Sequence, residues 1–430
     1  MSQVSAGAGT GSVWLVGKKS AFFTLFVFFF LTQIDFVDRQ MMVTVFPYLK
    51  EQWGLSDTQL GMLPMAIHIA TAMLVIPTAW FIDRWSRKNV VVIMCVIWAA
   101  GVAGCGMATG YAMLLVCRII CGSGEAAYNP AAQALLSAQF PEKHRSKAIA
   151  LNQVGASLGA PVGFMAGSIV IDKLGADHVL GILALPAFVF AVLALFIKDY
   201  KTVRVETQKE EKGSYLDVIA SMLKTPSLIF LYVGAIIMTM IMGAGMSWMP
   251  SYFSRIAGMS VIGSTRVAAM LMFSSTCALL ILGPILDILY KKHANAGPLV
   301  LASGLSCSTV LYVLVYGVLP PGSAIQIGVL LLASLSLGIV TTAGIVSVIN
   351  LVHPSVRATA ISLLVSCQSL LGFSLGPVVA GIISDHFDLG ASMLIIHAMT
   401  GVAAIGYWIC TVTYKRDIAK VAKAEISFEK

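Results

Sequence analysis

The chain has 430 residues, of which 58% are hydrophobic and only 11% are charged, and its formal net charge at pH 7 is +8. A soluble domain carries about 25% charged residues, so this composition excludes the polar, water-exposed surface of a soluble protein. It indicates a protein embedded in a membrane. The basic residues are spread over alternate loops rather than gathered in one patch, so we expect no nucleic acid partner.

Apolar stretches long enough to cross a bilayer recur along the chain and predict twelve transmembrane helices. The fold class expected is therefore all-α integral membrane. The first stretch is not followed by a small-residue cleavage site, so we interpret it as a retained span rather than a signal peptide. We place the spans at residues 20–47, 59–81, 89–108, 112–138, 146–170, 178–197, 227–253, 266–289, 297–317, 323–350, 358–383 and 391–413.

One long polar segment, residues 198–225, divides the spans into two bundles of six. The bundles cover residues 20–197 and 226–414, between an N-terminal tail (1–19) and a C-terminal tail (415–430). On this topology, 22 of the 28 Lys and Arg residues fall on the face that carries both tails and the polar segment. Because cytoplasmic loops are rich in Lys and Arg, we expect both termini and the linker to be cytoplasmic.

Charged residues lie inside two of the expected spans, where each costs at least roughly 2.5–3.5 kcal/mol at mid-bilayer and marks a polar pathway by default. Asp38 and Arg39 lie in the first span, and Arg118 and Glu125 in the fourth. The latter two are two helical turns apart and share a face. Asp35 stands four residues before Arg39, a spacing that favours an ion pair. If the two helices face one cavity, two arginines and three carboxyl groups meet there.

Burial raises the pKa of a carboxyl group and a neighbouring arginine lowers it, so a carboxyl group beside an arginine can titrate near the working pH. We therefore predict that Glu125 is the principal proton-binding residue, with Asp38 and Asp35 as further proton sites. Arg39 and Arg118 are predicted to hold the anionic group of a substrate, since a guanidinium group fits a carboxylate. The alternative is a static ion-pair network that only locks two helices together.

Other polar and aromatic residues of the spans are candidates for substrate contacts. Five methionines lie between Met238 and Met249 in the seventh span. Because methionine adapts to varied apolar surfaces, they favour an apolar or aromatic substrate. Ordinary packing or hydrogen bonding between helices is the alternative for each candidate. The candidates are His68, Tyr128, Trp248, Tyr252, Asn350 and Gln368.

We expect no enzymatic activity, metal site or cofactor. All eight cysteines lie in apolar segments, and none forms a CxxC pair. The sequence Gly372-Phe-Ser374-Leu-Gly376 has the spacing of a hydrolase nucleophile elbow, but that motif needs a preceding strand, and here it lies inside an expected helix. Energy for transport would then come from an ion gradient or from the gradient of the substrate.

The two halves repeat one another, as they do in many transporters. Asp83-Arg84-Trp85-Ser86-Arg87-Lys88 follows the second span, and Gly283 and Asp287 occupy the matching place at the end of the eighth. The first loop resembles the G-x-x-x-D-R-x-x-R-K signature of the Major Facilitator Superfamily, with Ala79 in place of the glycine. Arg118-x-x-x-Gly122-x-Gly124-Glu125-Ala126 resembles the helix-four signature of the same family. The resemblance implies two six-helix bundles and a cytoplasmic gate formed by Asp83, Arg84, Arg87, Lys88 and Asp287.

Two branches of this superfamily fit the sequence. The Asp-Arg pair of the first span, with Arg-x-x-x-Gly-x-x-Glu-Ala in the fourth, resembles the anion:cation symporters, which carry carboxylates with protons. Residues 124–140 resemble the Spinster-like branch equally well, and its members move lysolipids and other amphipathic molecules. Both branches usually have Asn at the position of Asp35.

We therefore expect a secondary active transporter that carries a small organic anion, a carboxylate with an apolar body, together with protons by alternating access. It would work as a monomer in the cytoplasmic (inner) membrane, with the anion, protons and the lipid bilayer as its partners. The alternative is a Spinster-like transporter or exporter of an amphipathic lipid or drug. An intramembrane enzyme or a channel is the alternative from another class.

Overall fold

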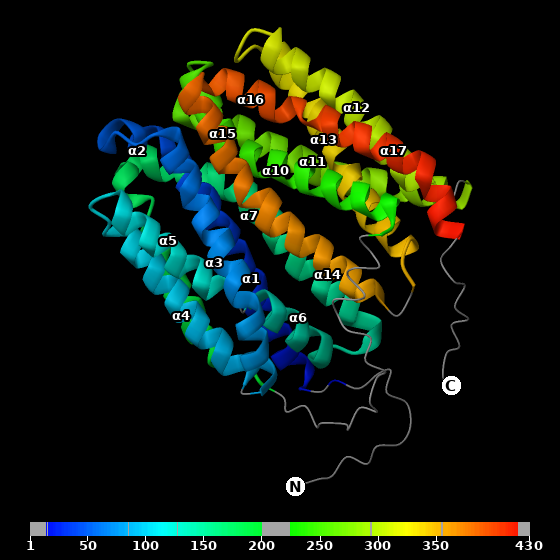
Figure 1. Cartoon of the computed structure of the whole chain (residues 1–430). Coiled ribbons are helices and arrows are strands. Elements are labelled where there is room, and N and C mark those ends of the chain that lie inside the picture. The colour runs from blue at the N-terminus through cyan, green and yellow to red at the C-terminus, as the bar shows by residue number, and fades with distance from the viewer. Residues whose placement is uncertain are drawn as a thin grey trace, which may run out of the picture.

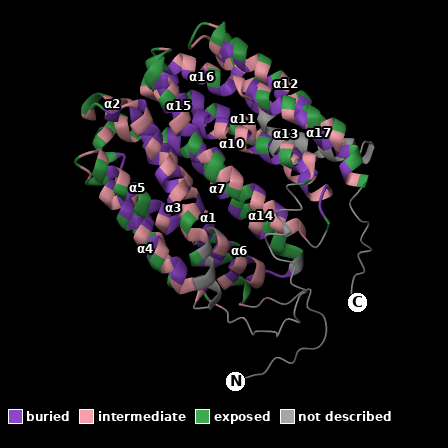
Figure 2. Ribbon diagram, in the orientation of Figure 1, coloured by how far each residue is buried: buried purple, intermediate pink, exposed green. Residues whose placement is uncertain are grey.

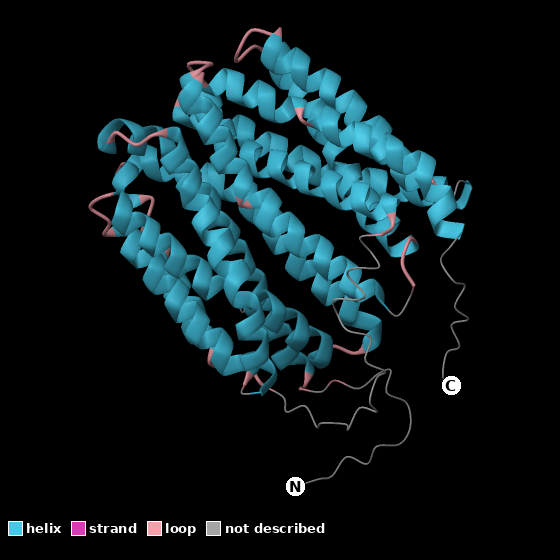
Figure 3. Ribbon diagram, viewed as in Figure 1, coloured by secondary structure: helices cyan, strands magenta, loops and turns pink. Residues whose placement is uncertain are grey.

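The computed structural model describes residues 14, 16–84, 86–126, 128–199, 224–292, 295–353 and 356–419. These ranges are helical, without a strand, and their helices lie within or overlap the twelve expected spans (Figure 3). Among the described residues, eight helical stretches are long and apolar enough to cross a membrane, and two of these stretches join consecutive elements. The all-α membrane fold predicted from the sequence is confirmed.

The first half holds six of the expected spans, and two of them differ from the prediction. The fourth is interrupted after Glu125, and the sixth is short, because only its second part forms a regular helix. The elements are α1 (Lys18–Thr44), α2 (Phe46–Trp53), α3 (Asp57–Arg84), α4 (Arg87–Gly106), α5 (Tyr111–Glu125), α6 (Tyr128–Gln139), α7 (Glu142–Leu174), the 3₁₀ turn η1 (Ala176–His178) and α8 (Ala184–Ala194).

The second half is also helical, and its eleventh span changes helix type along its length. Between two α-helical parts lies a π turn, in which the Ser374 N–H donates to the Ser369 carbonyl five residues earlier (3.1 Å). The elements are α10 (Pro226–Arg255), α11 (Val261–Lys292), α12 (Ala296–Gly317), α13 (Ala324–Asn350), α14 (Arg357–Cys367), the π turn η3 (Gln368–Phe373), α15 (Leu375–His386), α16 (Leu389–Ala398) and α17 (Thr400–Ala419).

Several helices begin at residues that satisfy the free N–H groups of the first turn. The Ser86 hydroxyl accepts from the Asn89 N–H (3.1 Å) at the start of α4. The Asp388 carboxylate accepts from the Ala391 N–H (2.8 Å) at the start of α16. Such caps fix where a helix starts and therefore where its side chains point.

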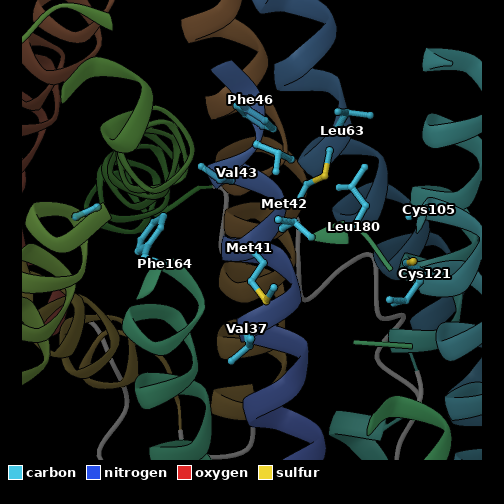
Figure 4. Close-up of a cluster of buried hydrophobic side chains, with 14 of the residues drawn as sticks. Val37, Met41, Met42, Val43, Phe46, Leu63, Cys105, Cys121, Phe164 and Leu180 are labelled. Atoms are coloured by element: carbon cyan, nitrogen blue, oxygen red, sulfur yellow. The ribbon is translucent and has the colours of Figure 1, made fainter. Parts of the chain in front are cut away.

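Close contact between α1 and α7 positions the first span. A Cβ atom on Gly159 would lie 2.6 Å from the Gln33 carbonyl oxygen, so only glycine allows the two backbones to approach so closely. Figure 4 shows Val37 and Met41 of α1 beside Phe164 of α7, within a cluster of buried apolar side chains. This contact holds one face of α1 against α7.

The two halves lie side by side and meet through α3 with α15, α7 with α11, and α1 with α10 (Figure 1). Buried residues lie mainly where helices face one another (Figure 2). Large apolar side chains also cover the outside, where Leu185 is 73% and Val412 is 80% exposed. An apolar outer surface is what a protein surrounded by lipid requires.

Candidate functional site

Arg39 of α1 joins three helices at the centre of the molecule. Its Nε donates to Asp35 Oδ1 (3.1 Å), one turn earlier on the same helix. Its Nη2 donates to Glu125 Oε2 at the end of α5, and its Nη1 lies 3.5 Å from His68 Nδ1 of α3. The i, i+4 pair and the meeting of the first and fourth spans, both expected from the sequence, are observed.

Tyr128 of α6 completes this group. Its hydroxyl donates to Asp35 Oδ2, so both oxygens of that carboxyl group are engaged. Glu125 is the last residue of α5 and Tyr128 opens α6, so the interruption of the fourth span lies between two residues of the group. Asp35, Glu125 and Tyr128 are all buried.

A second buried pair lies beside the first. Arg118 Nη1 donates to Asp38 Oδ2 (2.9 Å), which links α5 to α1 again. Among the described residues, Arg118 Nε and Nη2 and Glu125 Oε1 are buried without a hydrogen-bond partner. The two groups together contain three carboxyl groups and two guanidinium groups.

A cavity of about 490 Å³ separates the two halves at this level, and we call it the central cavity. The first half gives it polar side chains, including Asp35, Arg39 and His68, and Arg118 also lines it. The side chain of Arg39 is 20% exposed, whereas the carboxyl groups that it contacts are almost fully buried. The second half contributes apolar side chains and three serines: Met242, Met246, Met272, Phe373 and Pro377, with Ser247, Ser275 and Ser369.

Four candidates of the second half lie away from the lining of the central cavity, as do Asp38, Glu125 and Tyr128 of the first half. Trp248 is buried and donates from Nε1 to the Pro377 carbonyl (2.9 Å), and Tyr252 is buried and accepts from Gln326 Nε2 (2.9 Å). Both hold helices together in this conformation. Asn350 ends α13 outside that lining, and Gln368 lines a smaller cavity inside the second half.

The predicted gate is only partly visible. The side chains of Asp83, Arg84 and Asp287 lie outside the described part of the structure. Arg87 is mostly buried, and the Lys88 N–H donates to Asp199 Oδ2 (3.3 Å) just beyond α8. The gating role of these residues stays a prediction.

An ionic cluster that sequence reasoning missed joins the halves at the end of the molecule that carries α2. The carboxylate of Asp57, the first residue of α3, accepts two hydrogen bonds from Arg255 of α10 (2.9 and 3.0 Å). It also accepts from Lys50 Nζ (2.6 Å) and from the Ser384 hydroxyl of α15 (2.5 Å). A single buried carboxylate therefore ties α3 to two helices of the other half.

A second carboxylate strengthens this junction. Asp385 of α15 accepts from the Asp57 N–H and the Thr58 N–H (both 2.8 Å) and from the Thr58 hydroxyl (2.6 Å). It thus caps α3 from the opposite half, where the helix dipole also favours a negative charge. We call Lys50, Asp57, Arg255, Ser384 and Asp385 the inter-half latch. The only sequence signal for it was an acidic residue at a helix start.

Backbone packing closes the same end. A Cβ atom on Gly61 of α3 would lie 2.4 Å from the Pro377 carbonyl oxygen of α15. The two helices are therefore in direct backbone contact just beyond the central cavity. The α2 end is sealed in this conformation by packing as well as by charge.

Comparison with known proteins agrees with this architecture. A sequence model of the Major Facilitator Superfamily matches residues 22–373. The chain is 26% identical to an MFS-type efflux pump of Mycolicibacterium smegmatis, across 95% of this chain and 96% of the pump. It is 24% identical to a hexuronate transporter of Bacillus subtilis, across 62% of this chain and 64% of that protein.

A solved structure has the same fold. The crystal structure of a bacterial homolog of the human lysosomal transporter Spinster, inward-facing and unoccupied, superposes with a TM-score of 0.81 at 19% identity, across 93% of this chain and 99% of the other. The sequence match of the superfamily covers most of the chain. The chain therefore belongs to the Major Facilitator Superfamily and is a multi-pass membrane transporter rather than an enzyme.

Proposed function

We propose that the protein is a proton-coupled transporter that carries a small organic anion with an apolar body by alternating access. The observation that carries this proposal is the charge distribution in the lining of the central cavity. Its charged side chains, Asp35, Arg39 and Arg118, all come from the first half. The wall from the second half has no charged side chain among the described residues and includes Met242, Met246 and Phe373. An anion whose charged group faces the first half and whose body faces the second half fits such a space.

The pairing of charges supports a role for protons. Arg39 donates to both Asp35 and Glu125, whereas Arg118 donates to Asp38. If every group is ionised, the shared arginine faces two negative charges and cannot balance both. A proton on Glu125, whose Oε1 has no partner among the described residues, relieves this excess and leaves Arg39 available for the anion of a substrate.

Alternating access would use the inter-half latch. The distribution of basic residues predicts that the α2 end is non-cytoplasmic, so the latch would close the outer side while the central cavity serves the cytoplasmic side. Protons and substrate can shift this equilibrium only by binding one conformation more tightly than the other. We place this monomer in the cytoplasmic membrane.

The relatives support an organic anion and an apolar cargo alike. A hexuronate is a carboxylate, and the relative named after it supports the anion. The efflux pump and the Spinster homolog, together with the apolar second wall, favour the second candidate, outward movement of an amphipathic lipid or drug. A carrier of the second kind would bind lysolipid and ignore small carboxylates.

The first test is uptake by proteoliposomes with an imposed inward proton gradient. Wild-type protein is expected to accumulate its anion under the gradient. Glu125→Gln should abolish accumulation but retain exchange of labelled for unlabelled anion, because the site still binds substrate and only its proton is lost. Glu51→Gln, at an exposed position on α2, is the matched control and should behave as wild type. Full gradient-driven accumulation by Glu125→Gln would contradict the proposed coupling between proton and anion movement.

A further inference from the structure

We propose that a second, smaller cavity inside the second half receives the apolar tail of the transported anion. This inference rests on the proposed function and specifies its substrate class, an anion with an alkyl or aryl tail. The cavity has a volume of about 130 Å³ and lies among α10, α13, α14, η3 and α17. We call it the side cavity.

The two cavities share part of their walls. Met242 of α10 and Phe373 of η3 line both the central cavity and the side cavity. The two spaces therefore adjoin at these two residues. Methionine is unbranched and adapts its conformation easily, so one of the two residues of this partition can move to admit a ligand.

The local backbone places Phe373 at the partition. Phe373 is the last residue of the π turn, and π turns inside α-helices occur frequently at functional sites. Its ring is only partly buried and stacks on the His68 ring, with 6.0 Å between ring centroids. Rotation of the Phe373 ring would join the two cavities without a movement of the helices.

The charged group and the partition are neighbours. His68 lies between them, since its Nδ1 is 3.5 Å from Arg39 Nη1 and its ring contacts Phe373. A ligand that binds its anionic end to Arg39 therefore has Phe373 within reach of its next few atoms. This order of contacts selects a molecule with a charge at one end and a slender apolar body.

The side cavity is suited to such a body. Leu231, Ala235, Met238 and Leu364 give it a mainly apolar lining. Its volume is close to that of an engineered apolar cavity of about 150 Å³ that binds benzene. It would take one aryl ring or a short alkyl segment, and its apolar surface would favour that segment over water.

Gly344 of α13 offers a direct way to fill the side cavity. It lines the cavity, and a Cβ atom built on it meets nothing within 4 Å. Gly344→Leu should therefore occupy the space without displacing its neighbours, and replacing a helical glycine favours the helix. Gly328→Leu is the matched control, because Gly328 lies on the same helix, is exposed and also has open space around its Cβ position.

The experiment measures binding of n-alkyl carboxylates of increasing length to purified full-length protein. In wild type, affinity should rise about fourfold for each methylene that leaves water, until the side cavity is full. In Gly344→Leu the rise should stop several methylenes earlier, with affinity for the shortest carboxylates unchanged. Gly328→Leu should follow wild type. An identical length dependence in Gly344→Leu and wild type would overturn the tail site.

A parallel series of n-alkyl trimethylammonium ions separates this proposal from the proposed function. If only carboxylates bind and Gly344→Leu does not change their length dependence, the anion carrier stands and the tail site is wrong. If both series bind equally and Gly344→Leu shortens the chain length at which affinity stops rising in both, the tail site stands and the choice of an anion is wrong. Binding of carboxylates alone, with a shortened limit in Gly344→Leu, supports both.

Discussion

At the scale of single residues, the two arginines of the site differ in their partners. Arg39 donates to two carboxyl groups and lines the central cavity with part of its surface exposed. Among the described carboxyl groups, Arg118 donates to Asp38, and its side chain is completely buried. The shared and partly exposed arginine is the one suited to exchange a partner during transport. The other is suited to hold α1 against α5.

This difference predicts that Arg118→Met destabilises the protein by roughly 3–5 kcal/mol, because Asp38 would keep a buried charge without its partner. Combining it with Asp38→Asn should recover part of the loss, since the unpaired charge is then gone. Thermal unfolding in detergent measures both effects. Lys173→Met, at an exposed position, is the control. An Arg118→Met protein as stable as wild type would show that the pair is not needed for folding.

The sequence allowed part of this site to be predicted. The spacing of Asp35 and Arg39 fixes their distance along one helix, so their pairing followed from helix geometry. Which carboxyl group each arginine contacts depends on the rotation of α1 relative to α5, and spacing along a helix carries no information about that rotation. The hydrogen bond from Tyr128 to Asp35 was missed for the same reason.

At the scale of helices, glycine controls how closely α3 and α5 approach. A Cβ atom on Gly122 would lie 2.4 Å from the Ile67 carbonyl oxygen, and the Thr71 hydroxyl donates to the Gly122 carbonyl (2.9 Å). His68 follows Ile67 on α3, and Glu125 ends α5. This contact therefore sets the distance between the helices that bring His68 and Glu125 to Arg39.

We expect Gly122→Ala to push α3 and α5 apart and to cost roughly 1–3 kcal/mol, the usual range for an overpacked contact. Gly328→Ala is the comparison, because Gly328 is exposed, its Cβ position is open and alanine favours a helix, so the change should be neutral or stabilising. Thermal unfolding and binding of the anion would be measured together. If Gly122→Ala matches Gly328→Ala in both measurements, the close contact does not contribute to stability or binding.

The twelve spans could be predicted because each is a long apolar run. The break after Glu125 also has a signal in the sequence, since Pro130 lacks an N–H and its ring clashes with the carbonyl group four residues earlier. The π turn at Gln368–Phe373 has no such signal, because it depends on contacts with neighbouring helices, which a hydropathy pattern does not record. For the same reason, the faces of Trp248 and Tyr252 could not be assigned from their place in the seventh span.

At the scale of the molecule, the inter-half latch places two carboxylates where the halves meet. Asp57 contacts α10 and α15, and Asp385 caps α3 from the other side. Every one of these bonds except that from Lys50 crosses between the halves. The latch must therefore break when the α2 end opens, and its strength helps to set how often that happens.

Asp57→Asn is expected to weaken the latch, because the amide keeps the shape but loses the charge that Lys50 and Arg255 face. Losing a hydrogen bond to a charged group costs roughly 1.5–3 kcal/mol, which corresponds to about a tenfold or larger shift between two conformations. Spin labels at Glu51 and Phe387, both exposed at the α2 end and in different halves, should report a new population at longer distance.

The control for this experiment is Asp388→Asn. Asp388 lies three residues after Asp385 but caps α16 within its own half, so its loss should leave the distance distribution unchanged. The labels require a background without the eight native cysteines. If Asp57→Asn and Asp388→Asn give the same distribution as wild type, the ionic contacts do not hold the α2 end closed.

The surplus carboxyl group lets the site bind one proton with each monoanion, and this pairing has an electrical consequence. In the proposed cycle, an empty site without a proton carries one negative charge, and a site loaded with one proton and one monoanion carries the same charge. The loaded site and the empty site therefore carry the same charge in opposite directions. The electrical work, about 2.3 kcal/mol per charge per 100 mV of membrane voltage, cancels over the whole turnover. Accumulation of a monoanion then follows the pH difference alone, at about tenfold per pH unit.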